Sequence, residues 1–290
     1  MIDSTKRDGV RVPAGNFRQV LARLEIDTRL LGMIGGLLII WVGLHLLTDG
    51  TFLTARNLWN LAVQTSVVGI ISTGMVLVIV LRQIDLSVGS VLGFTGMIMA
   101  VVMVEVLPSA IGWGWLVALA VGLLTGAVVG AFQGYWIAYR GVPSFIVTLA
   151  GLLIFRGGAW LLTQGRTVAP LDPTFQLLGG GLNGSIGATW SWVVGLLGIL
   201  AASIIALRAR RRRRSMGFTV KPLWAELTQL GIVIAAIVGF VLVMNAYPRP
   251  RTDIARGIPV PVLILIACAI GMTALVRLTK FGRYVYAIGG

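Results

Sequence analysis

The sequence predicts an all-α protein, a polytopic transmembrane bundle of about eight helices whose N-terminus lies in the cytoplasm. Two features of composition carry this prediction: 57% of the 290 residues are hydrophobic and only 12% are charged, and the mean hydropathy is +0.92. A third is arrangement, because the apolar residues are gathered into long runs with most of the cations between them. This balance excludes a soluble globular domain and a disordered chain.

The apolar runs have the length of membrane-spanning helices. A helix rises about 1.5 Å per residue, so about 20 residues cross a hydrocarbon core about 30 Å thick, whereas barrel strands need only about ten alternating residues. Only 82–85 separate two of the runs, so a pair of helices and a re-entrant or broken helix both remain open for 61–107. The eight predicted spans are 30–47, 61–81, 86–107, 111–138, 142–162, 190–207, 230–247 and 258–278.

The distribution of Lys and Arg predicts that both ends of the chain are cytoplasmic, because cations accumulate in the cytoplasmic loops of membrane proteins. With the N-terminus inside, 18 of the 24 Lys and Arg lie on inner segments and five on outer ones, while Arg156 lies within a span. The outer cations Arg249, Arg251 and Arg256 run against this trend. We expect a cytoplasmic N-terminal arm over 1–29.

One transmembrane domain is expected over 30–290, with two long connections. Residues 163–189 form a Gly- and Pro-containing external loop, a candidate docking surface because loops of this length are frequently functional. Residues 208–222 form a basic cytoplasmic loop. Anionic lipid attracts such a segment by about 1 kcal/mol per cation near the surface. Membrane lipid is therefore the expected partner, and no nucleic acid is expected despite the net charge of +14.

Residues for covalent chemistry are scarce. The chain has one histidine, His45, and one cysteine, Cys268, so a two-histidine zinc site, a cysteine-based zinc site and an intrachain disulfide are excluded. It contains no G-x-x-x-x-G-K-[ST], G-x-S-x-G or H-E-x-x-H motif. We expect no enzyme, no metal and no cofactor in this chain, and any ATP and Mg²⁺ used for transport would be bound by a partner ATPase.

Polar residues inside the apolar runs are the candidates for a substrate path, because a charge at mid-membrane costs about 2.5–3.5 kcal/mol on insertion scales. Asp85, with Ser87, is expected to cap a helix N-terminus and, in a broken helix, also to line the path. Arg156 is expected to pair with Asp85 or with carbonyl groups freed near Gly157. Gln133 is a weaker signal, typical of a hydrogen bond between helices. The candidate path residues are Asp85, Ser87, Gln133, Arg156 and Gly157.

Four ordered strings extend the interpretation. They are QIDLSVGS at 83–90, VPSFIVTLAG at 142–151, RG at 156–157 with LTQGR at 162–166, and TKFGRYVYAIGG at 279–290. Together they resemble the membrane permeases of bacterial ABC importers for ribose, xylose, galactose and related sugars.

The resemblance implies a multi-pass permease of the bacterial inner membrane that translocates a monosaccharide. The segment 208–247 is similar to an insertion in the longer, xylose-type members, which favours D-xylose over ribose, galactose or a multiple-sugar system. The implied partners are cytoplasmic ABC ATPase subunits, a periplasmic sugar-binding protein and a second permease copy, as a homodimer.

The last string carries a further expectation. In the family it leads into the cytoplasmic coupling helix, so 279–290 would be the start of the coupling region and the chain resembles a C-terminally truncated member. The candidate residues for coupling to the ATPase are Phe281, Gly282, Arg283, Tyr284, Tyr286, Gly289 and Gly290.

Two other classes of function are weaker alternatives. An ion-coupled secondary carrier needs a relay of carboxylates within the membrane, and only Asp85 and Glu105 could serve. A membrane-embedded enzyme needs a nucleophile with its base, or a metal site, and the sequence offers neither arrangement.

Overall fold

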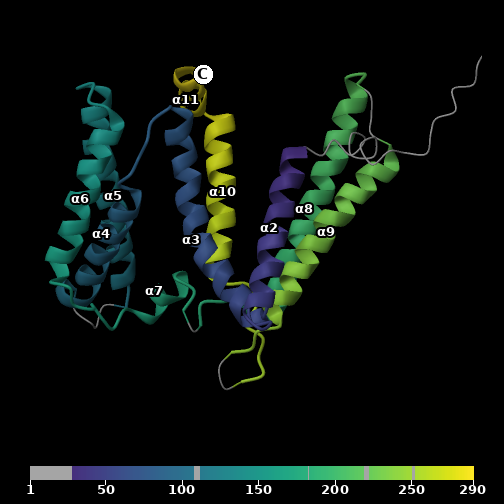
Figure 1. Ribbon diagram of the computed structural model, residues 1–290, viewed down its shortest axis with the longest axis horizontal. Coiled ribbons are helices and arrows are strands. Elements are labelled where there is room, and N and C mark those ends of the chain that lie inside the picture. Colours follow the sequence, from purple (N-terminus) through teal and green to yellow (C-terminus); the bar gives the residue numbers. More distant parts are fainter. Residues whose placement is uncertain (1–27, 108–111, 182, 219–221, 250–251) are drawn as a thin grey trace, which may run out of the picture. The chain divides into compact units, whose positions relative to one another are not determined.

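The computed structural model of the chain (Figure 1) describes residues 28–107, 112–181, 183–218, 222–249 and 252–290. Nearly all of the predicted N-terminal arm, 1–27, lies outside the described residues. The helices are α2 (Thr28–Leu47), α3 (Ala55–Val80), α4 (Val88–Val101), which continues as the π-helical turn η1 (Val102–Val106), α5 (Gly114–Ala138), α6 (Ser144–Thr163), α7 (Pro173–Leu178), α8 (Gly187–Ser215), α9 (Leu223–Asn245), α10 (Val260–Leu278) and α11 (Lys280–Gly289).

The all-α prediction is confirmed. Seven of the described helices are long and apolar enough to cross a membrane, and α2 contains a shorter apolar stretch, Leu31–Leu47. Each of the eight predicted spans corresponds to one of these helices. The stretch 61–107 is two helices, α3 and α4, joined by a non-helical segment. Each of the two, with η1 counted as part of the second, is long and apolar enough to cross a membrane, which favours a pair of helices over a re-entrant or broken helix.

The surfaces of these helices are apolar. Leu123 is 69% exposed, Ile154 63% and Leu161 70%, and many other large hydrophobic side chains are similarly open. A water-soluble protein rarely shows contiguous apolar patches above a few hundred Å². Lipid is therefore the solvent that these helices require.

The chain divides into two compact units. The first comprises residues 1–58 and 188–247, and the second comprises 59–187 and 248–290. In the first unit, α8 and α9 meet at Gly195, where an added Cβ would lie 3.0 Å from Cγ2 of Val241. Val241 is buried at this contact. Small residues at such a crossing allow two helices to approach closely in lipid.

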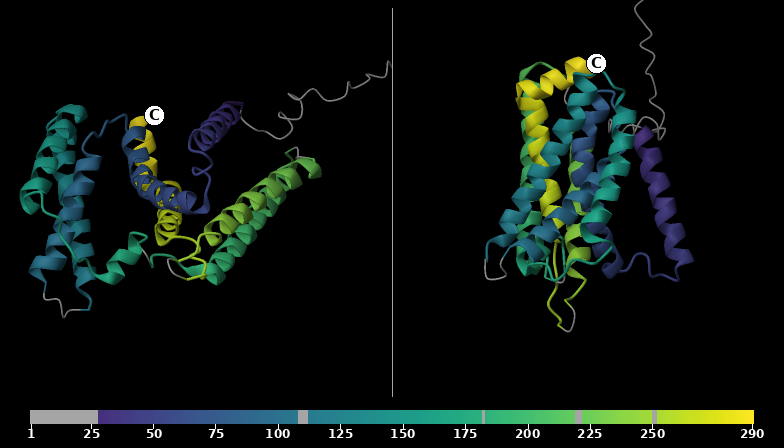
Figure 2. Two further views of the ribbon diagram at one scale, coloured as in Figure 1. Left: turned by 60° about the horizontal axis from the view of Figure 1, so that its bottom comes forward. Right: turned by 90° about the vertical axis from the view of Figure 1, so that its left-hand side faces the viewer.

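The second unit contains a three-helix core in which α4 packs against both α5 and α6 (Figures 1 and 2). Gly122 of α5 lies against the side chain of Met99, leaving no room for a Cβ. Gly158 of α6 lies against Phe94, whose ring centroid is 5.4 Å from that of Phe155. Glycine on the outer two helices thus accommodates large side chains of the central one.

The predicted outer connections of the second unit meet one another. The indole Nε1 of Trp59 donates to the carbonyl oxygen of Gly257 at 3.0 Å, and the amide of Ile186 donates to the carbonyl oxygen of Ile258 at 3.1 Å. The guanidinium of Arg256 lies 4.8 Å above the Trp59 ring. Arg256 is only 4% exposed, so this outer cation is a packed structural group.

The connection predicted to be a basic cytoplasmic loop differs from the prediction in one respect. α8 continues through the arginines to Ser215, so the first part of the predicted basic loop 208–222 is helical. Arginine is a good helix former, and nothing in the run breaks the helix before Gly217. Residues 219–221 lie outside the described part of the chain.

The chain turns sharply between α10 and α11, and Figure 2 shows α11 crossing the end of α10. Thr279 caps α11, since its Oγ1 accepts from the amide of Gly282 at 3.4 Å. An added Cβ on Gly282 would overlap the carbonyl group of Val276, and one on Gly289 would overlap the carbonyl oxygen of Val80. Glycine at these two positions lets α11 lie against the ends of α10 and α3.

We predict that Gly282→Ala lowers the free energy of unfolding by about 1–3 kcal/mol, because the methyl group must displace backbone at the corner. Gly271→Ala on α10 is the matched control, since nothing lies within 4 Å of its added Cβ. The control should be neutral or stabilising, because alanine favours a helix over glycine. Thermal unfolding of the purified variants in detergent measures the difference, and equal midpoints would contradict the packing described here.

Candidate functional site

The break between α3 and α4 is the centre of the candidate site. Arg82 adopts the left-handed conformation with φ +57°, and the amides of Leu81 and Gln83 still bond back to α3. The chain then runs without helical structure to Ser87, and α4 begins at Val88. Figure 1 shows this segment descending from the end of α3 to a helix that starts partway along α5 and α6.

α6 holds the backbone of the non-helical segment on both sides. The amide of Ile84 donates to Oγ of Ser144 at 3.1 Å. Oγ1 of Thr148 makes its shorter bond, 2.8 Å, to the carbonyl oxygen of Ser144, and it also lies 3.2 Å from the carbonyl oxygen of Ile84. Backbone groups outside a helix lack water as a partner in the hydrocarbon region, so they need partners from protein. The first two turns of α6 supply such partners for Ile84.

Asp85 binds Ser87 but does not cap α4 as predicted. Oδ1 of Asp85 accepts from both the amide and Oγ of Ser87, each at 2.7 Å. Ser87 itself occupies the N-cap position and makes no side-chain capping bond. The cap interpretation is therefore wrong in its geometry: the carboxylate closes a local turn before the helix, because Ser87 is the donor within its reach.

Gln133 of α5 completes the polar cluster. Its Nε2 donates to Oγ of Ser87 at 3.0 Å, and both side chains are buried, with Ser87 0% and Gln133 7% exposed. The Ser87 hydroxyl carries a single proton, which its shorter contact directs to Asp85. The amide, hydroxyl and carboxylate thus form one chain of hydrogen bonds, in which each bond polarises the next.

Gly151 provides the space for Gln133. An added Cβ on this glycine would overlap Nε2 of Gln133 and would lie 3.3 Å from Cβ of Ser87. Gly151 is buried within α6. The cluster therefore sits at a close approach of α4, α5 and α6.

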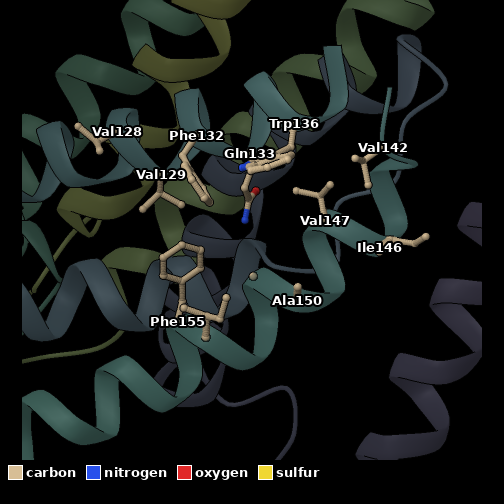
Figure 3. Close-up of a pocket in the computed structure, with 12 residues that line it drawn as sticks. Val128, Val129, Phe132, Gln133, Trp136, Val142, Ile146, Val147, Ala150 and Phe155 are labelled. Carbon is tan, nitrogen blue, oxygen red and sulfur yellow. The ribbon is translucent and has the colours of Figure 1, made fainter. Parts of the chain in front are cut away.

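Two hollows share Gln133 in their lining. One, of about 530 Å³, is lined by Asp85, Gln133, Ser144 and Thr148 together with apolar side chains and Ile288 of α11. The other, of about 560 Å³, lies between α5 and α6. Figure 3 shows the amide of Gln133 in this second hollow among apolar and aromatic side chains. The polar lining belongs to the first hollow, which is the better candidate for a hydrophilic substrate.

Arg156 and Gly157 do not join this cluster. α6 runs unbroken from Ser144 to Thr163, so no carbonyl groups are freed near Gly157. Arg156 is exposed, and the ion pairs within the described residues are Glu105 with Arg166 and Arg210 with Glu226. The pairing expected between Arg156 and Asp85 is absent from them. The assignment of Arg156 and Gly157 to the path stays a prediction.

The candidate coupling residues lie on α11. Gly282 is buried at the corner and Gly289 lies against the end of α3. Phe281 is 50% exposed, Tyr284 64% and Tyr286 56%. Arg283 and Gly290 are also exposed. α11 therefore presents aromatic and cationic groups to its surroundings.

Three residues that build the site were not among the sequence candidates. Ser144 and Thr148 bind Ile84 across 60 and 64 positions of sequence, and Gly151 makes room for Gln133. All three lie in the string 142–151, so their motif was noticed although their roles were not. A repeat of small and hydroxyl residues every three or four positions was the available signal.

We predict that Ser87 and Gln133 are energetically coupled by about 0.5–1.5 kcal/mol, the usual contribution of a buried hydrogen bond. The double-mutant cycle uses Ser87→Ala, Gln133→Leu and the combined variant, with the free energy of unfolding measured in mixed micelles. If the two single changes simply add, the side chains do not interact in the folded protein.

Comparison with known proteins places the chain among transport permeases. Residues 57–290 match the family described as the branched-chain amino acid transport system permease component. The chain is 36% identical over 266 residues to the xylose transport system permease protein XylH of Escherichia coli (strain K12), covering 92% of this chain and 64% of that protein. It is 38% identical over 245 residues to XylH of Haemophilus influenzae, covering 84% and 60%.

A more distant relative supports the same assignment. The ribose import permease protein RbsC of Escherichia coli (strain K12) is 43% identical over 118 residues, which is 40% of this chain and 35% of RbsC. No solved structure matches. The chain spans less than two thirds of the length of the XylH proteins that it matches.

The resemblance to sugar permeases is confirmed by these relatives, and the apolar helices agree with a multi-pass protein of the inner membrane. The family match covers most of the chain, including the helix break, the polar cluster and α11. The chain belongs to the family of membrane permeases described as the branched-chain amino acid transport system permease component.

Proposed function

We propose that the chain is the permease of a binding-protein-dependent ABC importer that translocates a monosaccharide, D-xylose in the first instance, across the inner membrane. The observation that carries the proposal is the polar cluster of Asp85, Ser87 and Gln133 at a helix break inside an otherwise apolar unit. Polar groups in a membrane-spanning region are costly, and they commonly mark a substrate pathway.

The chemistry of the cluster suits a sugar. Sugar hydroxyls donate and accept hydrogen bonds, and carboxylates, amides and hydroxyls are suitable partners. Within the part of the chain described, Oδ2 of Asp85 has no hydrogen-bond partner, whereas Oδ1 holds Ser87. One oxygen thus maintains the site and the other can accept from a passing hydroxyl.

The substrate assignment rests on the relatives. Two XylH proteins are named for xylose transport and match over most of this chain, including the basic hairpin of α8 and α9. RbsC, named for ribose import, matches over a shorter stretch. D-Xylose is therefore proposed before ribose or galactose.

The proposed partners supply energy and recognition. ABC ATPase subunits, which bind the ATP and Mg²⁺, would dock at the predicted inner face and contact α11. A periplasmic sugar-binding protein would dock on the outer connections, including 163–189, and a second permease copy would complete the pathway. ATP binding would shift the permease pair between inward-facing and outward-facing states, and the permease itself would make and break no covalent bond.

The first prediction concerns the pathway. Asp85→Ala and Gln133→Leu should each lower uptake of radiolabelled D-xylose about tenfold or more in cells that contain the full-length permease and its partners, because each removes about one good polar contact. Thr125→Val is the matched control on α5, because the Thr125 hydroxyl bonds to the carbonyl oxygen of Val121 in its own helix.

Insertion of each variant is checked by its level in purified membranes. Wild-type uptake by both site variants at normal levels would refute the pathway assignment. Arg156→Ala is measured beside them. If this variant alone lost uptake, the pathway would be assigned to the exposed side of α6 instead of to the polar cluster. Ribose and galactose are assayed in parallel, so that a change of sugar is distinguishable from loss of transport.

The second prediction concerns coupling. Tyr284→Ala should weaken association with the cognate ABC ATPase by about fivefold or more, because exposed aromatic side chains commonly dominate interface energies. Trp160→Ala on α6 is the control, since Trp160 is 65% exposed but lies on another helix. Co-purification and permease-stimulated ATP hydrolysis measure the effect. Equal association in both variants would exclude Tyr284 from the contact.

A further inference from the structure

The cytoplasmic end of α8 extends beyond the hydrocarbon core. α8 has 29 residues, so it is about 44 Å long at about 1.5 Å per residue, whereas the core is about 30 Å thick. Its final part contains six arginines between positions 208 and 214. These cations therefore lie at the level of lipid headgroups, on the face predicted to be cytoplasmic.

α8 and α9 enclose a groove at this end. They pack closely at Gly195 and Val241, and Figure 1 shows them diverging toward the arginines. The groove between them has a volume of about 430 Å³. Its lining repeats every three or four residues on both helices, so it is formed by the two faces turned toward each other.

The groove is apolar at depth and charged at its mouth. The apolar lining comes from Ala202, Ile205, Ala206, Leu230 and Val233. The polar lining nearer the ends of the helices comes from Arg210, Arg213, Glu226 and Gln229.

A second hollow adjoins the mouth. It has a volume of about 540 Å³ and shares Ala209 and Arg213 with the groove, and it adds Arg212, Met216 and Phe218. Arginine therefore lines both spaces where they meet.

The charges favour an anion. Glu226 is the one carboxylate that lines the groove, and it forms an ion pair with Arg210. Arg212 and Arg213 contribute two further positive charges at the mouth. A guanidinium has five donors in a planar fork, which suits the oxygens of a phosphate.

We propose that the α8–α9 groove binds an anionic phospholipid, with one acyl chain between the two helices and the headgroup phosphate at Arg212 and Arg213. An acyl chain suits the apolar lining deep in the groove. A phosphate suits the arginines at its mouth, which lie at the level of lipid headgroups. A nucleic acid would leave the apolar part unused. This proposal goes beyond the transport function and does not depend on it.

The test measures lipid retention by the full chain, purified in mild detergent with equal amounts of phosphatidylglycerol and phosphatidylcholine, by native mass spectrometry. The wild type should retain phosphatidylglycerol in preference to phosphatidylcholine. Arg212→Gln with Arg213→Gln should weaken that binding about tenfold or more, since each cation near the surface contributes appreciably. These changes leave the Arg210–Glu226 ion pair intact.

The control removes the same charge elsewhere on the helix. Arg208→Gln with Arg211→Gln changes arginines that line neither hollow, so it should retain phosphatidylglycerol nearly as the wild type does. Equal loss in both pairs would mean diffuse attraction to an anionic surface and would overturn the proposal.

A second pair of variants tests the groove with all charges in place. Ala206→Trp fills the apolar part and should abolish selective retention, whereas Leu207→Trp places the same ring outside the lining and should not. Inorganic phosphate at millimolar concentration should fail to displace the bound lipid. Displacement by phosphate, or normal retention by Ala206→Trp, would show that no acyl chain is held there.

Discussion

The constraint on which the site depends is that every backbone polar group in the membrane needs a partner within the protein. The chain leaves α3 at Val80 and does not become helical again until Val88. The amides of Leu81, Arg82 and Gln83 still bond back to α3, but those of Ile84 and Ser87 need partners elsewhere. For Ile84, α6 supplies the hydroxyl of Ser144, which accepts from the amide, and the hydroxyl of Thr148, which lies within hydrogen-bond distance of the carbonyl oxygen. The carboxylate of Asp85 accepts from the amide of Ser87.

These bonds also fix the helices that surround the break. Because Ser87 binds Gln133 while Ile84 binds the start of α6, the beginning of α4 is tied to both neighbouring helices at once. Close packing supports the same arrangement, since Gly151 leaves room for Gln133 and Gly122 leaves room for Met99. A polar site can therefore exist inside an apolar unit, because bonds within the protein hold Ile84, Ser87 and Gln133 in place before any substrate arrives.

Much of the fold followed from composition and pattern alone. The length of the apolar runs predicted each membrane helix, since a helix in lipid must be both long and apolar. The break near Asp85 was also visible, because polar residues interrupt two such runs. The packing of the helices could not be predicted from these patterns. Trp59 donates to Gly257 across 198 positions of sequence, and no local pattern predicts that contact.

The site was predicted only in part, for a related reason. Asp85, Ser87 and Gln133 do come together, although Gln133 alone looked like an ordinary contact between helices. Arg156 looked important because a charge in lipid is costly, yet its side chain is exposed on α6. Sequence shows that a charge needs a partner, but which face of a helix turns inward depends on how α4, α5 and α6 pack.

The most direct test of this account asks whether the break lines an aqueous path. Cys268 is the sole cysteine, so Cys268→Ser gives a background for single cysteines at Ile84, beside the polar hollow, and at Leu153, on the apolar surface of α6. A membrane-impermeant maleimide applied to inside-out vesicles should label Ile84→Cys and spare Leu153→Cys. If both cysteines remain unlabelled from either side of the membrane, the break is a sealed structural feature and the central claim fails.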